Sequence, residues 1–95
     1  MTLTEQFDEA LRAVNEKRGS VYGHPADDFA RAAELKAAIS GCKDARIRHA
    51  MEMICAKLSR LVETPDHLDS WIDIAGYART ARMIIDRDRE TKPDG

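Results

Sequence analysis

Apolar residues that recur every three or four positions are the feature that most constrains the fold of this 95-residue chain. The most regular run predicts a helix that begins after Asp44 as its N-cap and ends near Val62. Three further segments have the same period, and no segment alternates apolar and polar residues as a half-buried strand would. The sequence therefore predicts an all-α fold. The inward positions of the most regular helix are Ile47, Met51, Ile54, Leu58 and Leu61.

Glycine and proline residues delimit the two helices that come before it. The first is predicted over about residues 4–18, with a capping box at its start and Gly19 as its stop. The second begins at Pro25, a residue suited to a first helical turn, and ends at Gly41. Its apolar residues are predicted to face inward: Phe29, Ala32, Leu35 and Ile39.

The fourth helix is predicted to open with Thr64 as N-cap and Pro65 as its first residue, and to run to about Asp86. Helices three and four should form an antiparallel hairpin. Four helices joined by short loops favour a compact four-helix bundle, with residues 1–86 as one domain and 87–95 as a polar tail. The fourth helix has a broad apolar face that we expect to be buried, with Trp71 in the core or in a subunit interface. That face carries Leu68, Trp71, Ile72, Ile74, Ala75, Ala78, Ala81 and Ile85.

Composition excludes several classes of protein. The net charge of -2 argues against binding to duplex nucleic acid. No apolar run approaches the roughly 20 residues that span a bilayer, and the first residues lack the order of a signal peptide, so we expect a protein of the bacterial cytoplasm.

The two cysteines are predicted to be reduced thiols. We expect Cys55 in the core and Cys42 in a loop. Because so short a chain buries only about two-thirds of its unfolded surface, we also expect a homo-oligomer.

An acidic stripe on the fourth helix is the first candidate for a functional site. At about 100° per residue its members fall on one side of the helix. The short connection should bring Lys57 and Arg60 of the third helix close to this stripe. Lys57 could bind phosphate as a point charge and Arg60 as a bidentate fork, while the aspartates could hold Mg²⁺. The alternative is a set of ordinary surface ion pairs. The stripe comprises Asp66, Asp69, Asp73 and Tyr77.

The segment Tyr22, Gly23, His24 is the second candidate. We expect a compact loop over the mouth of the site, in which Tyr22 stacks on a base and the Gly23 backbone approaches phosphate. The alternative is a turn that only positions the second helix. Gly76, inside the fourth helix, indicates close approach of another backbone or of a ligand, and Tyr77 beside it could donate a hydrogen bond or stack.

Four segments together resemble one group of small, mostly uncharacterised bacteriophage and prophage proteins, over about residues 15–82. That group is similar to the MazG-like and dimeric dUTPase-like all-α nucleoside triphosphate pyrophosphatases, whose bundles oligomerise and bind magnesium and nucleotide between helices. The resemblance is carried by Tyr22-Gly23-His24-Pro25, the segment around Phe29, Lys57-Leu58-Ser59-Arg60-Leu61 and Asp69-Ser70-Trp71-Ile72-Asp73-Ile74-Ala75-Gly76-Tyr77-Ala78.

The resemblance implies a nucleotide ligand and paired acids on two facing helices. Asp66, Asp69 and Asp73 match one acidic element, and Glu34 is the candidate for the other. Hydrolysis needs a metal in fixed geometry, whereas binding needs complementary charge and stacking. We therefore expect a phage-derived nucleotide-binding protein that sequesters a nucleotide second messenger of bacterial anti-phage defence. The alternatives are a Mg²⁺-dependent nucleotide pyrophosphohydrolase and a non-catalytic protein-interaction module.

Overall fold

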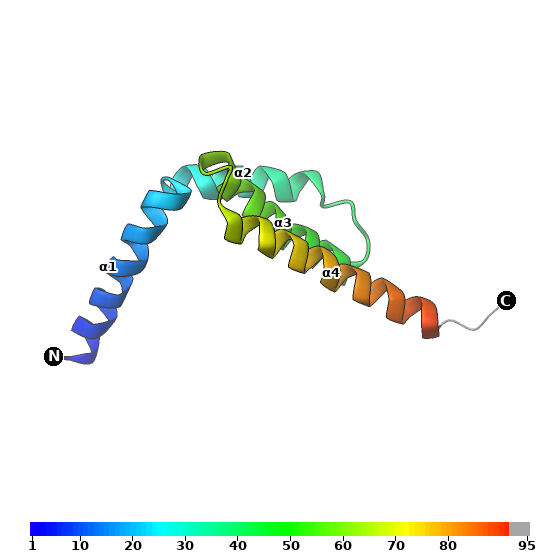
Figure 1. The fold of residues 1–95 in the computed structure, drawn as a ribbon, viewed down its shortest axis with the longest axis horizontal. Coiled ribbons are helices and arrows are strands. Elements are labelled where there is room, and N and C mark those ends of the chain that lie inside the picture. Colours follow the sequence, from blue (N-terminus) through cyan, green and yellow to red (C-terminus); the bar gives the residue numbers. More distant parts are fainter. Residues whose placement is uncertain (92–95) are drawn as a thin grey trace.

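Four α-helices make up the protein in the computed structural model, which describes residues 1–91 apart from the side chains of residues 18–21. The predicted all-α class is confirmed. Helix α4 continues to Thr91, past the predicted end near Asp86, and residues 92–95 of the predicted tail lie outside the described residues. The helices are α1 (Leu3–Tyr22), α2 (Pro25–Ala38), α3 (Ala45–Glu63) and α4 (Leu68–Thr91) (Figure 1).

Helix α3 is the centre of the fold. Helix α4 runs back along it as the predicted antiparallel hairpin, and α2 packs on α3 without contacting α4 (Figure 1). Cys55 is buried as predicted, and Cys42 lies in the connection between α2 and α3. The core is small, because only four apolar side chains of the described residues are buried: Ala32, Ala50, Cys55 and Leu61.

Helix α1 extends away from the other three helices (Figure 1). The molecule is accordingly long, with extents of 64 × 31 × 23 Å, and the expected compactness is not found. Only one end of α1 meets α2 and α3. Four of its large apolar side chains are therefore at least 41% exposed: Leu3, Phe7, Leu11 and Val14.

The two ends of α1 show which local signals were correct. At the start, the Thr2 hydroxyl accepts a hydrogen bond from the Glu5 amide and the Glu5 carboxylate accepts one from the Thr2 amide, which confirms the capping box. At the other end, the helix continues through Gly19 to Tyr22. It ends at Gly23, whose φ of +74° is in the range that favours glycine. The predicted stop at Gly19 is therefore wrong.

Helix α4 begins at Leu68 and not at the predicted Pro65. The Thr64 carbonyl accepts a hydrogen bond from the His67 amide, which closes a turn before the helix. The His67 carbonyl then accepts a hydrogen bond from the Ser70 amide, and His67 Nδ1 lies 2.8 Å from the Ser70 hydroxyl. His67 thus caps the helix, and the threonine–proline pair belongs to the turn.

Much of the side of α4 predicted to face the core is exposed. Trp71 and Ile72 are 50% and 56% exposed, and Ser70, on the other side, is buried. Phe29 of α2, also predicted to face inward, is 63% exposed. The predicted face was too broad: Ile74, Ala81 and Ile85 of it are half-buried, together with Asp73 and Tyr77, on the side that packs on α3. The exposed positions on the predicted core side are Leu68, Trp71, Ile72, Ala75 and Ala78.

An acid–arginine cluster joins the start of α3 to the last turns of α4. Asp44 caps α3 by accepting hydrogen bonds from the Arg46 and Ile47 amides, as predicted. The Arg46 guanidinium binds both the Asp44 and the Asp88 carboxylates. The Arg46 side chain lowers the pKa of Asp44 from 3.8 to about 2, and it lowers the pKa of Asp88 as well. Both carboxylates thus favour their charged forms in the folded protein.

We expect this cluster to make the protein sensitive to acid. A carboxyl group whose pKa is lowered by folding stabilises the folded state above its ordinary pKa, and that contribution disappears as the pH falls through the lowered pKa. The loss should begin near pH 4 and continue towards pH 2, below which Asp44 is protonated.

The urea concentration at the midpoint of unfolding tests this expectation. It should fall less between pH 7 and pH 2.5 for Asp88→Asn than for the wild type. Asp86→Asn serves as the control, because Asp86 pairs with Arg82 and not with Arg46. An equal acid response in Asp88→Asn and wild type would contradict the assignment.

Candidate functional site

A hollow lies between the last turns of α1 and α3. Its cavity volume is about 350 Å³, and we call it the Tyr22 hollow. The Arg60 guanidinium lies over the Tyr22 ring, 4.3 Å from the ring centroid. The His67 ring meets Tyr22 edge to face, with 5.9 Å between centroids. Two cations and one aromatic ring therefore surround a space of small-ligand size. The hollow is lined by Val14, Lys17, Tyr22 and Arg60.

The Gly23 backbone determines how Tyr22 reaches Arg60. With a positive φ at Gly23, the chain turns from α1 into α2 within two residues. A β-carbon at Gly23 would lie 3.0 Å from Cδ of Glu63, so the Glu63 side chain packs directly on this backbone. A phosphate approaching Gly23 would meet the Glu63 carboxylate. The structure therefore favours a turning role for Gly23 over contact with phosphate.

His24, the next predicted ligand residue, caps α2. Its Nδ1 accepts a hydrogen bond from the Ala26 amide at 3.0 Å. That bond occupies the lone pair of Nδ1 and fixes the proton on Nε2 in the neutral ring. The alternative interpretation of this segment, a turn that positions the second helix, describes His24 well.

Lys57 and Arg60 face different partners, although they lie one turn apart on α3. The Lys57 ammonium pairs with the Asp73 carboxylate of α4 at 3.0 Å, and the lysine side chain is only 15% exposed. Arg60 faces Tyr22 on α1. The expected meeting of the cationic end of α3 with the acidic stripe is therefore seen in one ion pair, Lys57–Asp73, and Arg60 contributes to the Tyr22 hollow.

The candidate metal ligands do not converge within one chain. Asp66 lies in the turn before α4, and Asp69 is exposed in the first turn of that helix. Glu34 is exposed on α2, which does not contact α4. Over residues 1–91 no group of three or more histidine, cysteine or acidic side chains could hold a metal ion. These residues therefore do not form the expected magnesium centre in the single chain.

Tyr77 does not line the Tyr22 hollow. It lies ten residues after His67 along α4, which corresponds to about 15 Å of helix. Of the residues predicted to bind ligand, the structure brings together Tyr22 and Arg60 and leaves Tyr77 and Lys57 elsewhere.

Two parts of this region were not foreseen from the sequence. Lys17, which lies inside the predicted first helix but was not identified as a site residue, lines the hollow. The buried Ser59 hydroxyl has two acceptors within reach of its single proton, Asp28 Oδ1 at 2.7 Å and the Asp28 carbonyl at 2.9 Å. The Arg31 guanidinium donates to the Ser59 carbonyl at 2.8 Å and lies 3.5 Å from the Glu63 carboxylate. These contacts attach α2 to the end of α3 that carries Arg60.

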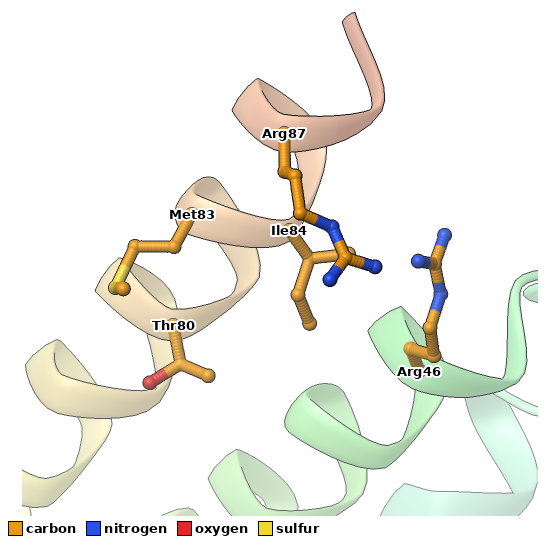
Figure 2. A pocket seen from close by; sticks show the side chains of 5 residues that line it. All are labelled: Arg46, Thr80, Met83, Ile84 and Arg87. Atoms are coloured by element: carbon orange, nitrogen blue, oxygen red, sulfur yellow. The ribbon is translucent and has the colours of Figure 1, made fainter. Parts of the chain in front are cut away.

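A second hollow, of about 320 Å³, lies at the opposite end of the α3–α4 hairpin. In Figure 2, Arg87 reaches towards Arg46 across Ile84, while Thr80 and Met83 lie on the far side. The Arg46 guanidinium is held by Asp44 and Asp88, so its charge is already balanced. This hollow contains none of the predicted site residues.

No helix in the described part of the chain has the length and apolar character to cross a bilayer.

The comparisons with known proteins point to bacteriophage. The chain is 34% identical over 87 residues to the Gene 55 protein of Mycobacterium phage D29. That match covers 92% of this chain and 58% of the relative, so the chain spans less than two-thirds of the relative's length. No solved structure matches. Residues 5–85 match DUF6378, a domain of unknown function. Because this match includes most of the helical region, the chain belongs to the DUF6378 family.

Proposed function

We propose that this protein binds a nucleotide or a nucleotide-derived signalling molecule in the Tyr22 hollow, in the cytoplasm of the infected bacterium. The observation that carries the proposal is the Arg60 guanidinium stacked on the Tyr22 ring beside Lys17. Arginine and lysine are the side chains that bind phosphate, and a guanidinium plane or an aromatic ring stacks on a nucleobase.

The stacked pair defines how such a ligand would lie. Because Arg60 lies over the Tyr22 ring, a base would stack on the outer face of the Arg60 guanidinium. Phosphates would then lie between Arg60 and Lys17. The apolar surface of Val14 would exclude water from one side of the ligand. Lys57 has no part in this arrangement, because its ammonium is held by Asp73.

Sequestration is favoured over hydrolysis. A pyrophosphohydrolase of the MazG-like type needs acidic side chains that hold magnesium and orient a water molecule. Within one chain, the described acidic residues do not gather for that purpose. This arrangement of the acidic residues over residues 1–91, together with a relative from a bacteriophage, supports a protein that binds a nucleotide messenger of host defence and removes it from solution.

The proposal predicts which cation matters. Arg60→Ala should weaken ligand binding by about 1.5–3 kcal/mol, a factor of roughly 10–150, because a charge-assisted contact and the stacking plane are lost together. Lys57→Ala should leave the affinity unchanged. Isothermal titration with ATP, a cyclic dinucleotide and ADP-ribose, each with and without Mg²⁺, measures the difference.

Controls and recovery of the ligand complete the test. Lys43→Ala removes an exposed cation from the α2–α3 connection and should have no effect. Ligand recovered intact after denaturation supports sequestration, and cleaved ligand supports the pyrophosphohydrolase. Equal loss of affinity in the Arg60 and Lys57 variants, or no uptake of any of the three compounds, would overturn the assignment of the hollow.

A further inference from the structure

Two helical faces of this chain are mainly apolar and uncovered. On α1 the face runs from Leu3 to Val14, and Phe7 at its centre is 63% exposed. On α4 the face opposite α3 runs from Leu68 to Met83, and Ile72 on it is 56% exposed. This second face also carries Arg79, whose guanidinium donates to the Met83 sulfur. We call the two faces the α1 face and the outer α4 face. Amphipathic helices of this kind normally bury such a face.

The chain exposes more surface than a compact monomer of the same mass would. The chain exposes 7135 Å². A compact monomer of 10.7 kDa exposes about 5,500 Å². The difference of roughly 1,600 Å² is about twice the 800 Å² that each partner buries in a standard protein interface. The single chain therefore has enough uncovered surface for a stable interface, and its core of four buried apolar side chains needs one.

The two faces also match in length and shape. At 1.5 Å per residue, the α1 face is about 17 Å long and the outer α4 face about 22 Å long. Gly76 lies on the outer α4 face, and nothing among the described residues comes within 4 Å of a β-carbon built there. A glycine beside exposed Ile72 and Met83 lets another helix approach the backbone closely.

We propose that two copies of this chain form a twofold dimer in which α1 of each copy packs on the outer α4 face of the other. In this arrangement the α1 face and the outer α4 face of both chains are covered. No face is left for a third copy, as expected for a dimer with twofold symmetry. A lipid surface fits less well, because α1 carries four acidic and three basic residues and interfacial helices are usually rich in lysine and arginine.

The test begins with the mass of the full-length protein in solution. Light scattering after size exclusion at micromolar concentration should give twice 10.7 kDa. Phe7→Glu and Ile72→Glu should each raise the dissociation constant of the dimer about 30-fold or more, because each places a charge at the centre of the contact. Phe29→Glu is the matched control, since Phe29 is as exposed as Phe7 but lies on α2. It should leave the dimer intact.

Cross-linking identifies which faces meet. Under mild oxidation, Phe7→Cys mixed with Ile72→Cys should form an interchain disulfide that neither variant forms alone. A monomeric wild type, dissociation by Phe29→Glu as strong as by Phe7→Glu, or faster cross-linking of Phe7→Cys with itself would each overturn the proposed dimer. Binding of the wild type to anionic vesicles that Phe7→Glu abolishes, without a dimer, would show that a membrane covers α1. Circular dichroism checks that each variant keeps its helix content.

Discussion

Replacing Leu61 by alanine should lower the free energy of unfolding by about 2–5 kcal/mol. Leu61 is 6% exposed and is the largest of the four buried apolar side chains. Its loss removes contacts at the meeting place of α3 with its neighbours and leaves a cavity that so small a core cannot easily fill. Because domains of this size have a total stability of about 5–15 kcal/mol, the change removes a large share of it. Urea denaturation followed by circular dichroism measures the effect.

The neighbouring residue provides the control. Val62 is 61% exposed on the same helix, so Val62→Ala should change the free energy of unfolding by no more than about 0.5 kcal/mol. Both substitutions remove methyl groups from α3, and only the burial differs. Equal destabilisation by the two would show that Leu61 does not belong to a core of the kind described.

Asp28→Ala should destabilise the protein by about 1–3 kcal/mol, because it removes a buried carboxylate, the nearer of the two acceptors of the Ser59 hydroxyl, and leaves only the backbone carbonyl. The Asp28 side chain is 3% exposed, and the Ser59 hydroxyl that donates to it is fully buried. For a domain of this length the melting temperature should fall by on the order of 10 °C. Differential scanning calorimetry measures the change, which should also loosen α2 from the end of α3 that carries Arg60.

Asp27→Ala separates the buried contact from the effect of charge at a helix start. Asp27 lies in the same first turn of α2 and is exposed, so both substitutions remove one carboxylate near the helix N-terminus. Only the Asp28 change should be large. In a double-mutant cycle with Ser59→Ala, the Asp28 effect should shrink once the hydroxyl is absent, and strict additivity would argue against the pair.

The parts of the fold that depend on short-range chemistry were predictable. The Asp44 cap and the capping box at Thr2 are formed by residues within three positions of one another, so their sequence is sufficient evidence. The Thr64–Pro65 signal failed because a turn satisfied the same backbone groups before the helix began. A residue type that favours helix N-caps can therefore form a cap, as Asp44 does, or lie in a turn before the helix, as Thr64 does.

Which side of α4 packs on α3 could not be predicted. Its sequence offers two sides with apolar residues, one with Ile72 and one with Ile74 and Ile85 beside Asp73, and periodicity alone does not choose between them. The structure buries the second, where Lys57 supplies a partner for Asp73. A single sequence does not say whether an apolar side faces its own chain or another one.

The candidate site was predictable only in part. Tyr22 and Arg60 were identified as site residues from their sequence, and the structure brings them together. Lys17 was missed, because nothing in the sequence indicates that the end of α1 lies beside Arg60 of α3. Asp28 was not singled out from the sequence, since nothing in the sequence reveals that Ser59, 31 residues later, lies beside it.

The Gly23 junction has a consequence for where this chain can accept foreign sequence. A side chain at this position would strain the backbone and displace Glu63 from its contact with Arg31, so a substitution or an inserted residue would re-aim the whole of α1. The α2–α3 connection is different, because Gly41 has open space around it and Lys43 is exposed. A tag or fluorescent domain spliced at residues 41–43 would leave the direction of α1 unchanged, whereas the same graft at residue 23 would not.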